Sequence, residues 1–356
     1  MPMIIQPRPF NLRKTLTVLA VLIVAMYFYY QRPPPLRFWK ISGEVWSAYS
    51  VKFTDHHMEQ PDVVQLKADI DALLNKVNHL MSTYLPDSEI SRFNHSTGLD
   101  PISISPEFAE VMTRALEICE LTGGVFSPSL DRLINAWGFG HQGARREPDA
   151  AALAEAMNLA GCDSVEVLPG YLLRKTKPGA AVNVNALVEG WSVDRVADLL
   201  ETRGVTNYFV EIGGEVFARG MSEKMRPWRV GIDRPVDNAA PGENYDLIVE
   251  VDNLGLATSG NYRKFTIAEN GEKVSHLLDP RTGRPATSSL ASVTVLAQDT
   301  ATADALATAL FVLGREEGLS FVEKLTEVDA AFIEHAEGDS FTTTFSPGFE
   351  EHLLKD

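Results

Sequence analysis

The sequence contains only two cysteines, Cys119 and Cys162, in 356 residues. They form neither a metal-binding spacing nor a Cys-x-x-Cys pair, so a cysteine-based metal or redox centre is not indicated. The simplest interpretation is that both are small buried hydrophobes. If the fold brings them together in an oxidising compartment they could form a disulfide, and the sequence leaves these alternatives open.

Positive charge and glycine-rich phosphate-binding motifs are also scarce. Lysine and arginine number 32 against 48 aspartates and glutamates, and the net charge of -16 argues against nucleic acid and anionic headgroups as partners. No Gly-x-Gly-x-x-Gly segment opens a helix after a strand, so a dinucleotide-binding fold of the Rossmann type is not predicted. The chain also has no internal repeat and no low-complexity segment.

One apolar run is present, at residues 15–30, and it contains no charged residue. It follows a basic tail, residues 1–14, and precedes a proline-rich linker, residues 31–40. The run is slightly short for a membrane span, which leaves a signal peptide and a membrane anchor as alternatives. The lack of a small-x-small cleavage site and the aromatic cluster at residues 27–30 favour the anchor.

With 45% apolar content the chain can bury a large core, and its length alone allows one large domain or two. We expect residues 41–356 to form one domain. Strand and helix patterns follow each other irregularly, which predicts an α+β fold of mixed sheets flanked by helices. Periodicity and capping residues predict helices at 63–80, 106–123, 148–161, 189–204, 304–325 and after Pro347. Strands are predicted at 45–53, throughout 208–295 and at 330–333.

Two segments near the C-terminus carry candidate chemistry. The segment Ser275–Gly283 places His276 at the mouth of an Asp-Pro, Thr-Gly turn. Asp304 and Thr308 lie four residues apart in an apolar helical pattern that Gly314 is expected to end, so both side chains share one face. Such an oxygen pair suits Mg²⁺. Taken alone, however, these residues have a simpler structural interpretation. His276 would be structural, Thr308 would bond back to its own helix, and Asp304 would pair with a distant Arg or Lys.

Further motifs precede these two segments in a fixed order. They are residues 81–94 (Met-Ser-Thr-Tyr-Leu-Pro-Asp-Ser-Glu-Ile-Ser-Arg-Phe-Asn), Trp137–Gly140, Asn185–Asp194, Gly213-Gly214 and Thr258–Tyr262. Together with the two segments they resemble the ApbE-type FAD:protein FMN transferase family, from about Gly43 to the C-terminus. No single motif is diagnostic, but seven in register make a chance match implausible.

The resemblance implies roles for individual residues. Asp304, Thr308 and the backbone carbonyl of Ala186 would hold Mg²⁺, and His276 would be the catalytic base. The ring of Tyr84 would stack on the isoalloxazine. Further flavin contacts are implied for Ser42, Val125, Phe126, Ser127, Asn183, Glu189 and Leu278. This assignment agrees with chemistry, because a pyrophosphate needs charge neutralisation and an alcohol nucleophile needs a proton acceptor.

The chain departs from the family's pattern in four places. Asn183 and Ser127 stand where many relatives have Asp, and Ala307 cannot supply the acidic ligand that some members have at this position. A Met-Gly-Thr pattern near the first strand appears here as Ser42-Gly43-Glu44. These changes bear on the flavin contacts and leave unchanged Tyr84, His276, Asp304 and Thr308.

The resemblance implies that a Thr or Ser hydroxyl of an acceptor protein attacks FAD, releases AMP and keeps FMN as an ester. Implied acceptors are exported FMN-binding proteins, such as subunits of Na⁺-pumping quinone reductase or Rnf-type complexes. Because members are typically exported, the expected location is the bacterial inner membrane, with the catalytic domain facing the periplasm. The chain has no cysteine after the apolar run for the lipoprotein attachment found in many relatives.

Two alternative functions stay open. An FAD pyrophosphatase would use water as the acceptor and release FMN and AMP, but members with that tendency carry Asn in place of Tyr84. A membrane-tethered flavin carrier without turnover is opposed by the retention of His276, Asp304 and Thr308.

Overall fold

The computed structural model describes residues 12–30, 35–140, 147–236, 242–261, 265–267, 273–337 and 340–354. Within these residues the helices are α1 (Leu12–Tyr30), α2 (Gln60–Met81), α3 (Glu89–His95), α4 (Pro106–Leu121), α5 (Asp131–Ala136), α6 (Ala150–Asn158), α7 (Asn185–Thr202) and α8 (Thr300–Val322), with 3₁₀ turns η1 (Cys162–Ser164) and η2 (Phe349–Glu351). The strands are β1 (Arg37–Glu44), β2 (Ala48–Asp55), β3 (Ile102–Ser103), β4 (Val165–Leu168), β5 (Leu172–Lys175), β6 (Asn207–Ile212), β7 (Glu215–Arg219), β8 (Trp228–Asp233), β9 (Tyr245–Val251), β10 (Leu254–Gly260), β11 (Phe265–Ile267), β12 (Lys273–Ser275), β13 (Leu278–Asp279), β14 (Arg284–Pro285), β15 (Leu290–Ala297), β16 (Asp329–His335) and β17 (Phe341–Phe345).

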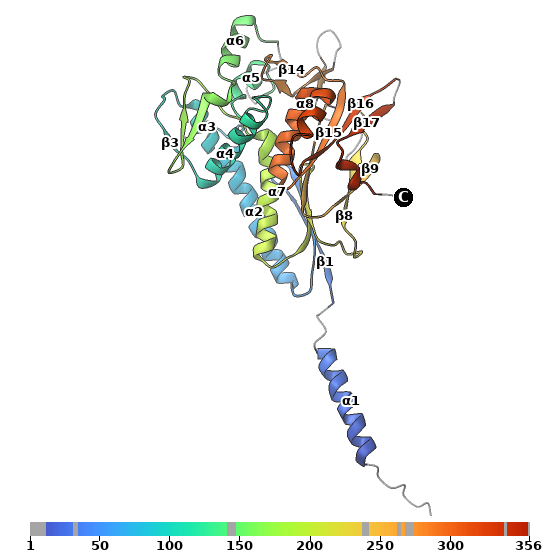
Figure 1. Ribbon diagram of the computed structural model, residues 1–356. Helices are drawn as coiled ribbons and strands as arrows, with labels where there is room; N and C mark the ends of the chain where they lie inside the picture. Colours follow the sequence, from blue (N-terminus) through green and yellow to red (C-terminus); the bar gives the residue numbers. More distant parts are fainter. Residues whose placement is uncertain are drawn as a thin grey trace, which may run out of the picture.

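An eight-stranded antiparallel sheet forms the centre of the fold (Figure 1). Its strand order is β1-β2-β6-β7-β10-β15-β16-β17. The predicted turns at Gly213-Gly214 and Asp252-Asn253 connect β6 to β7 and β9 to β10. Asn253 has a φ of 57°, a left-handed conformation that asparagine tolerates better than most residues. The sheet and its helices confirm the predicted α+β class.

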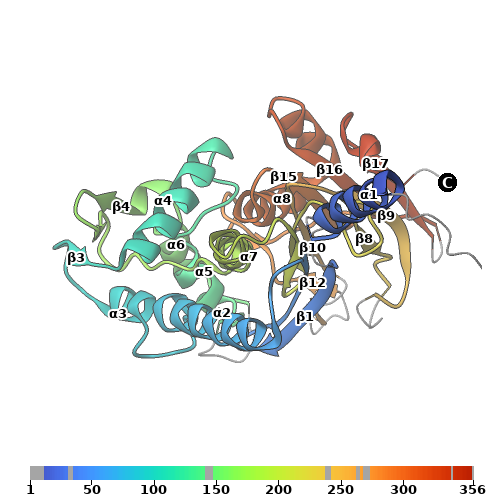
Figure 2. The same cartoon turned by 90° about the horizontal axis from the view of Figure 1, so that it is seen from below.

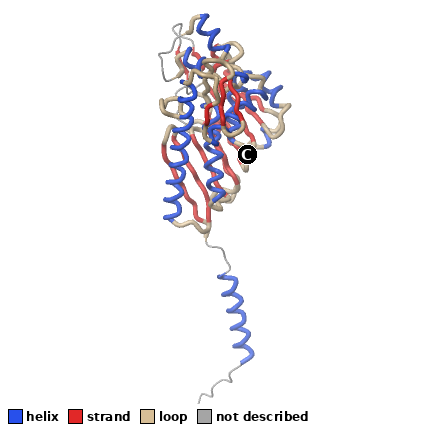
Figure 3. Tube along the Cα trace, turned by 90° about the vertical axis from the view of Figure 1, so that its left-hand side faces the viewer, coloured by secondary structure: helices blue, strands red, loops and turns tan. Residues whose placement is uncertain are grey.

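Helices cover one face of the sheet and a hairpin covers the other (Figures 2 and 3). Along β6, the side chains of Tyr208, Val210 and Ile212 pack with α2 and α7, because successive residues of a strand point to opposite faces. Phe209, between them, packs against the β8–β9 hairpin and η2. Helix α8 lies on β10 and β15, and all eight residues of β15 are buried.

Helices α3 to α6 and the small β3-β5-β4 sheet gather at one end of the molecule (Figure 2). Here a disulfide joins Cys119, near the end of α4, to Cys162 in η1. The interpretation of the cysteines as two unpaired hydrophobes is therefore wrong, because a segment that folds back over more than forty residues brings them together. The alternative left open by the sequence, a disulfide, is the one that the structure shows.

Several predicted boundaries differ from the structure. The sheet begins at Arg37, inside the range assigned to the linker, because β1 is an edge strand whose exposed, charged positions conceal its pattern. Helix α7 begins at Asn185, whose N–H donates to the Asn183 side chain, and not at Glu189. A 3₁₀ turn replaces the helix predicted after Pro347. Gly314 ends the helical stretch that carries Asp304 and Thr308, as predicted, with a φ of 78°, and a second helical stretch of α8 continues to Val322.

The predicted membrane segment coincides with α1, while tail residues 1–11 and linker residues 31–34 lie outside the described part of the chain. The apolar side chains described on α1, among them Leu19, Val21 and Ile23, are more than half exposed. Among the residues that the structure describes, no helix combines the length and apolarity needed to cross a membrane.

Candidate active site

A cavity of about 490 Å³ lies at the end of the sheet where the β6–β7 turn meets α7 and α8. Its lining comes from segments far apart in the sequence, which the fold brings to one place. Eleven of the twelve residues predicted for the site line it: Tyr84, Val125, Phe126, Ser127, Asn183, Ala186, Glu189, His276, Leu278, Asp304 and Thr308.

The twelfth residue, Ser42, does not line the cavity. It is exposed on β1, where it pairs with Ser50 of β2. Ser42 therefore lies outside the lining of this cavity, and its expected flavin contact stays a prediction. The residue of this hairpin that reaches the site is Ser47, in the turn after β1, whose hydroxyl donates to Glu189 Oε1 at 2.8 Å.

The predicted metal-binding pair projects from the first turns of α8. Asp304 is 7% exposed and accepts a hydrogen bond from the Gly190 N–H, with 3.1 Å between nitrogen and Oδ2. Thr308 Oγ1 lies 3.2 Å from Ser259 Oγ of β10. The i, i+4 spacing therefore places both oxygens at the cavity, as the sequence predicts.

Ala186 completes this group of oxygens. Its backbone is not helical (φ -87°, ψ 21°), although it lies in the first turn of α7. In a regular helix the Gly190 N–H would donate to the Ala186 carbonyl, whereas here it donates to the Asp304 carboxylate. The Ala186 carbonyl oxygen can therefore accept a further partner in the cavity.

Helix α8 is held in place by carboxylates at its N-terminus. Asp299 is the N-cap and accepts from the Thr302 N–H at 2.7 Å. Asp194 of α7 accepts from the N–H groups of Thr300 and Ala301, at 2.9 and 3.0 Å. Burial raises the pKa of Asp194 to about 7 against these hydrogen bonds, which favour the ionised form. Asp194 thus fixes the helix that carries Asp304.

A buried carboxyl group that the sequence analysis missed, Glu215, also lines the cavity. It is 8% exposed, and its Oε2 has no hydrogen-bond partner within the described structure. Burial, and then the negative charges of Asp304 and Glu189, raise its pKa well above the usual range. Its only sequence signal is its position directly after Gly213-Gly214.

His276 lies between β12 and β13 at the cavity wall and is partly exposed. The turn that follows has the predicted form, because the Gly283 N–H donates to the Asp279 carbonyl at 2.8 Å and Gly283 has a φ of 68°. The Trp137 Nε1–H donates to the Gly283 carbonyl at 2.7 Å. This bond joins the Trp-Gly-Phe-Gly motif to the turn beside the histidine.

Apolar and aromatic side chains also line the cavity. Val125 and Phe126 are buried, whereas the Tyr84 side chain is 61% exposed at the edge of the cavity. The Ser127 hydroxyl, a departure from the pattern that the family resemblance implies, donates to the Ala160 carbonyl at 2.7 Å. Asn183, the other departure from the pattern, accepts from the Asn185 N–H at 3.1 Å. Both substituted side chains therefore support local backbone.

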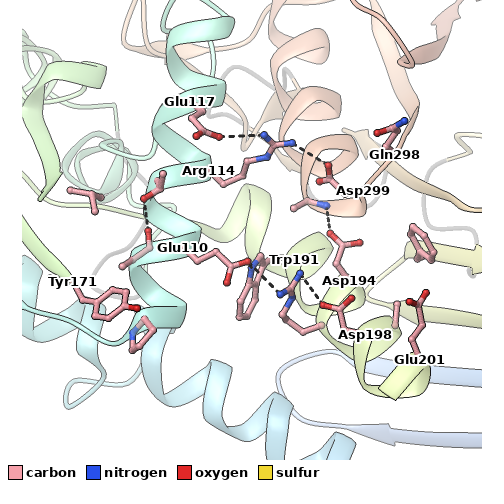
Figure 4. A pocket seen from close by; sticks show the side chains of 18 of the residues that line it. Glu110, Arg114, Glu117, Tyr171, Trp191, Asp194, Asp198, Glu201, Gln298 and Asp299 are labelled. Carbon is pink, nitrogen blue, oxygen red and sulfur yellow. Dashed lines mark hydrogen bonds and ion pairs between the residues drawn. The ribbon is translucent and has the colours of Figure 1, made fainter. Parts of the chain in front are cut away.

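A second cavity, of about 860 Å³, lies between α4 and α7 (Figure 4). Six carboxylates and two arginines line it, and Arg114 bridges Glu117 and Asp299 at 3.3 and 3.1 Å. None of the residues predicted for the site lines this cavity. The smaller cavity is therefore the candidate active site.

Named proteins are similar to this chain over most of its length. A relative from Vibrio cholerae serotype O1, named FAD:protein FMN transferase, is 36% identical over 317 residues, covering 87% of this chain and 90% of that relative. A relative of the same name from Haemophilus influenzae is 37% identical over 284 residues, covering 78% and 81% of the two chains.

Solved structures show the same fold. The flavin transferase ApbE from Vibrio cholerae aligns with a TM-score of 0.79 at 33% identity, over 90% of this chain and 100% of that chain. The apo form of the Pseudomonas stutzeri flavinyl transferase ApbE aligns with a TM-score of 0.80 at 33% identity, over 89% and 97%. The sequence model of the ApbE family matches residues 46–332 of this chain. The chain therefore belongs to the ApbE family.

Proposed function

We propose that this chain is an FAD:protein FMN transferase that moves FMN from FAD to a Thr or Ser hydroxyl of an acceptor protein and releases AMP. The observation that carries the proposal is the convergence of Tyr84, His276 and the Asp304/Thr308 pair on one cavity. The names of relatives at 36% and 37% identity support the same reaction. Expected acceptors are exported FMN-binding proteins, such as subunits of Na⁺-pumping quinone reductase or Rnf-type complexes.

Different residues of the cavity would bind the flavin and transfer the proton. Tyr84, Val125 and Phe126 offer apolar and aromatic surface for the flavin ring. His276 accepts the proton of the acceptor hydroxyl, whose oxygen forms a bond to the phosphorus on the riboflavin side. The bond from this phosphorus to the oxygen bridging to AMP breaks, and AMP leaves with that oxygen.

The cavity also fits the Mg²⁺ that the family resemblance implies. Asp304, Thr308 and the Ala186 carbonyl supply hard oxygens, which Mg²⁺ prefers, and the crowded carboxyl groups of Glu215, Asp304 and Glu189 favour a cation nearby. When bound, Mg²⁺ would neutralise pyrophosphate charge as it develops in the reaction.

The test is covalent labelling of an acceptor domain incubated with this protein, FAD and Mg²⁺, followed as flavin fluorescence on a denaturing gel. We expect labelling by the wild type, and loss of labelling with EDTA or in Asp304→Ala. Asp198→Ala, which removes an exposed carboxylate of α7 outside the site, is the matched control and should label normally. Full activity of Asp304→Ala at low Mg²⁺ would remove this residue from the metal site.

We further propose that α1 anchors the protein to the bacterial inner membrane, with the catalytic domain in the periplasm. The exposed apolar side chains of α1 support an anchor, and the Cys119–Cys162 disulfide supports an oxidising compartment. The protein should stay in the membrane fraction after salt and carbonate washes with an intact N-terminus, whereas Ile23→Asp should weaken retention. A soluble form that begins near Gln31 would instead identify residues 15–30 as a signal peptide.

A further inference from the structure

The Cys119–Cys162 disulfide closes the part of the chain that forms one wall of the active-site cavity. The cysteines are 43 residues apart, and α5 and α6 lie between them. This segment contributes seven residues to the cavity lining: Val125, Phe126, Ser127, Leu130, Ile134, Phe139 and Gly140. The disulfide therefore links the two ends of the chain segment that supplies these seven lining residues.

The first end of the wall is anchored to Cys119 itself. The Gly124 N–H donates to the Cys119 carbonyl at 2.8 Å. Gly123 and Gly124 have φ values of 61° and 85°, a left-handed path that glycine adopts without strain. The Phe126 N–H then donates to the Thr122 hydroxyl at 3.1 Å. The position of Val125 and Phe126 in the cavity thus depends on the last turn of α4.

The second anchor lies beside Cys162. The Ser127 hydroxyl donates to the buried carbonyl of Ala160 at 2.7 Å, two residues before Cys162. Gly124 also packs near the Cys162 sulfur, since a Cβ on this glycine would lie 3.9 Å from Sγ. The disulfide thus connects the two points to which the segment from Gly124 to Ser127 is tied.

The two cysteines differ in exposure. Cys119 is fully buried in the main core, whereas Cys162 is partly exposed. We therefore expect a dithiol reductant to attack at Cys162, the more exposed cysteine, with Cys119 as the leaving thiolate. The attacking dithiol then closes to its own disulfide, so two electrons and two protons convert the protein disulfide into two thiols.

We propose that this disulfide holds the seven cavity-lining residues of this segment in the conformation that binds FAD, and that reduction of the disulfide lowers the affinity for FAD. The inference rests on the proposed function, because FAD is taken as the ligand. It implies that a newly made chain in a reducing compartment binds FAD weakly, and that full affinity develops after oxidation.

The test compares FAD binding by the oxidised and reduced full-length protein. Protein reduced with dithiothreitol is desalted under argon, so that no reductant is present when FAD is added. It is then titrated with FAD and Mg²⁺. We expect the Kd for FAD to rise about tenfold, equivalent to about 1.4 kcal/mol, and to recover after reoxidation. Cys119→Ala/Cys162→Ala should show the raised Kd and should not respond to dithiothreitol.

Far-UV circular dichroism separates a local effect from unfolding. The inference requires that the spectrum of the reduced protein stay close to that of the oxidised protein. Equal FAD affinity in the two redox states would overturn it, and so would a loss of affinity that parallels a loss of secondary structure. Failure of the oxidised protein to bind FAD would instead contradict the proposed function.

Discussion

The backbone N–H of Gly190 donates to the carboxylate of Asp304 across the contact between α7 and α8. The absence of a side chain at Gly190 makes this contact possible. A Cβ here would lie 2.3 Å from the Thr300 carbonyl oxygen and 2.9 Å from the Cβ of Asp304. The glycine of the Glu-Gly pair therefore sets how closely the helix carrying Asp304 approaches the helix carrying Glu189.

Gly190→Ala should force α7 and α8 apart. Because the nearest atom is backbone, no side-chain rotation relieves the clash, and we expect a loss of about 1–3 kcal/mol in the free energy of unfolding. Displacement of Asp304 should also weaken Mg²⁺-dependent FAD binding. Urea unfolding and FAD titration measure the two effects.

Gly98→Ala is the matched control, because an added Cβ there meets only one atom, at 3.8 Å. It should leave both stability and FAD binding near wild type. If Gly190→Ala behaved like this control, the close approach of the two helices would have no bearing on the site.

Local sequence patterns predicted those features that depend on residues close in the chain. Ser105 caps α4 as expected, and the i, i+4 spacing placed Asp304 and Thr308 on one face of α8. The contacts that complete the site span much longer separations, as in the bond from Ser47 to Glu189 and the two bonds from Asp194 to α8. Only the folded sheet brings such residues together, so spacing alone could not reveal them.

The His276 prediction separates proton transfer from binding. His276→Asn should bind FAD with nearly unchanged affinity, since binding depends on stacking and metal, whereas FMN transfer should fall by about 10²- to 10⁴-fold. His335→Asn, which changes an exposed histidine of β16, should leave both quantities unchanged. Equal losses of FAD binding and transfer in His276→Asn would identify this histidine as structural.

Asp194 should make stability depend on pH in a defined direction. Its pKa is raised from 3.8 to about 7 in the folded state, chiefly by burial. Between about pH 4 and pH 7 the folded protein therefore binds the extra proton, and its stability relative to the unfolded chain falls as the pH rises. Asn cannot titrate, so the difference in unfolding free energy between wild type and Asp194→Asn should decrease over this range and level off above it. Urea unfolding at several pH values tests this, and a difference that stays constant or increases would contradict the raised pKa.

Tyr84 provides the test that separates transfer to a protein from hydrolysis. Its exposed ring at the cavity edge can cover the isoalloxazine, hold the flavin half while AMP leaves and limit the approach of water. Tyr84→Asn should therefore weaken FAD retention and raise the ratio of free FMN to protein-bound FMN, measured in one reaction at fixed Mg²⁺. Tyr84→Phe keeps the ring and should keep the wild-type ratio. If the wild type already released mostly free FMN in the presence of a competent acceptor, an FAD pyrophosphatase would replace the transferase as the proposed function.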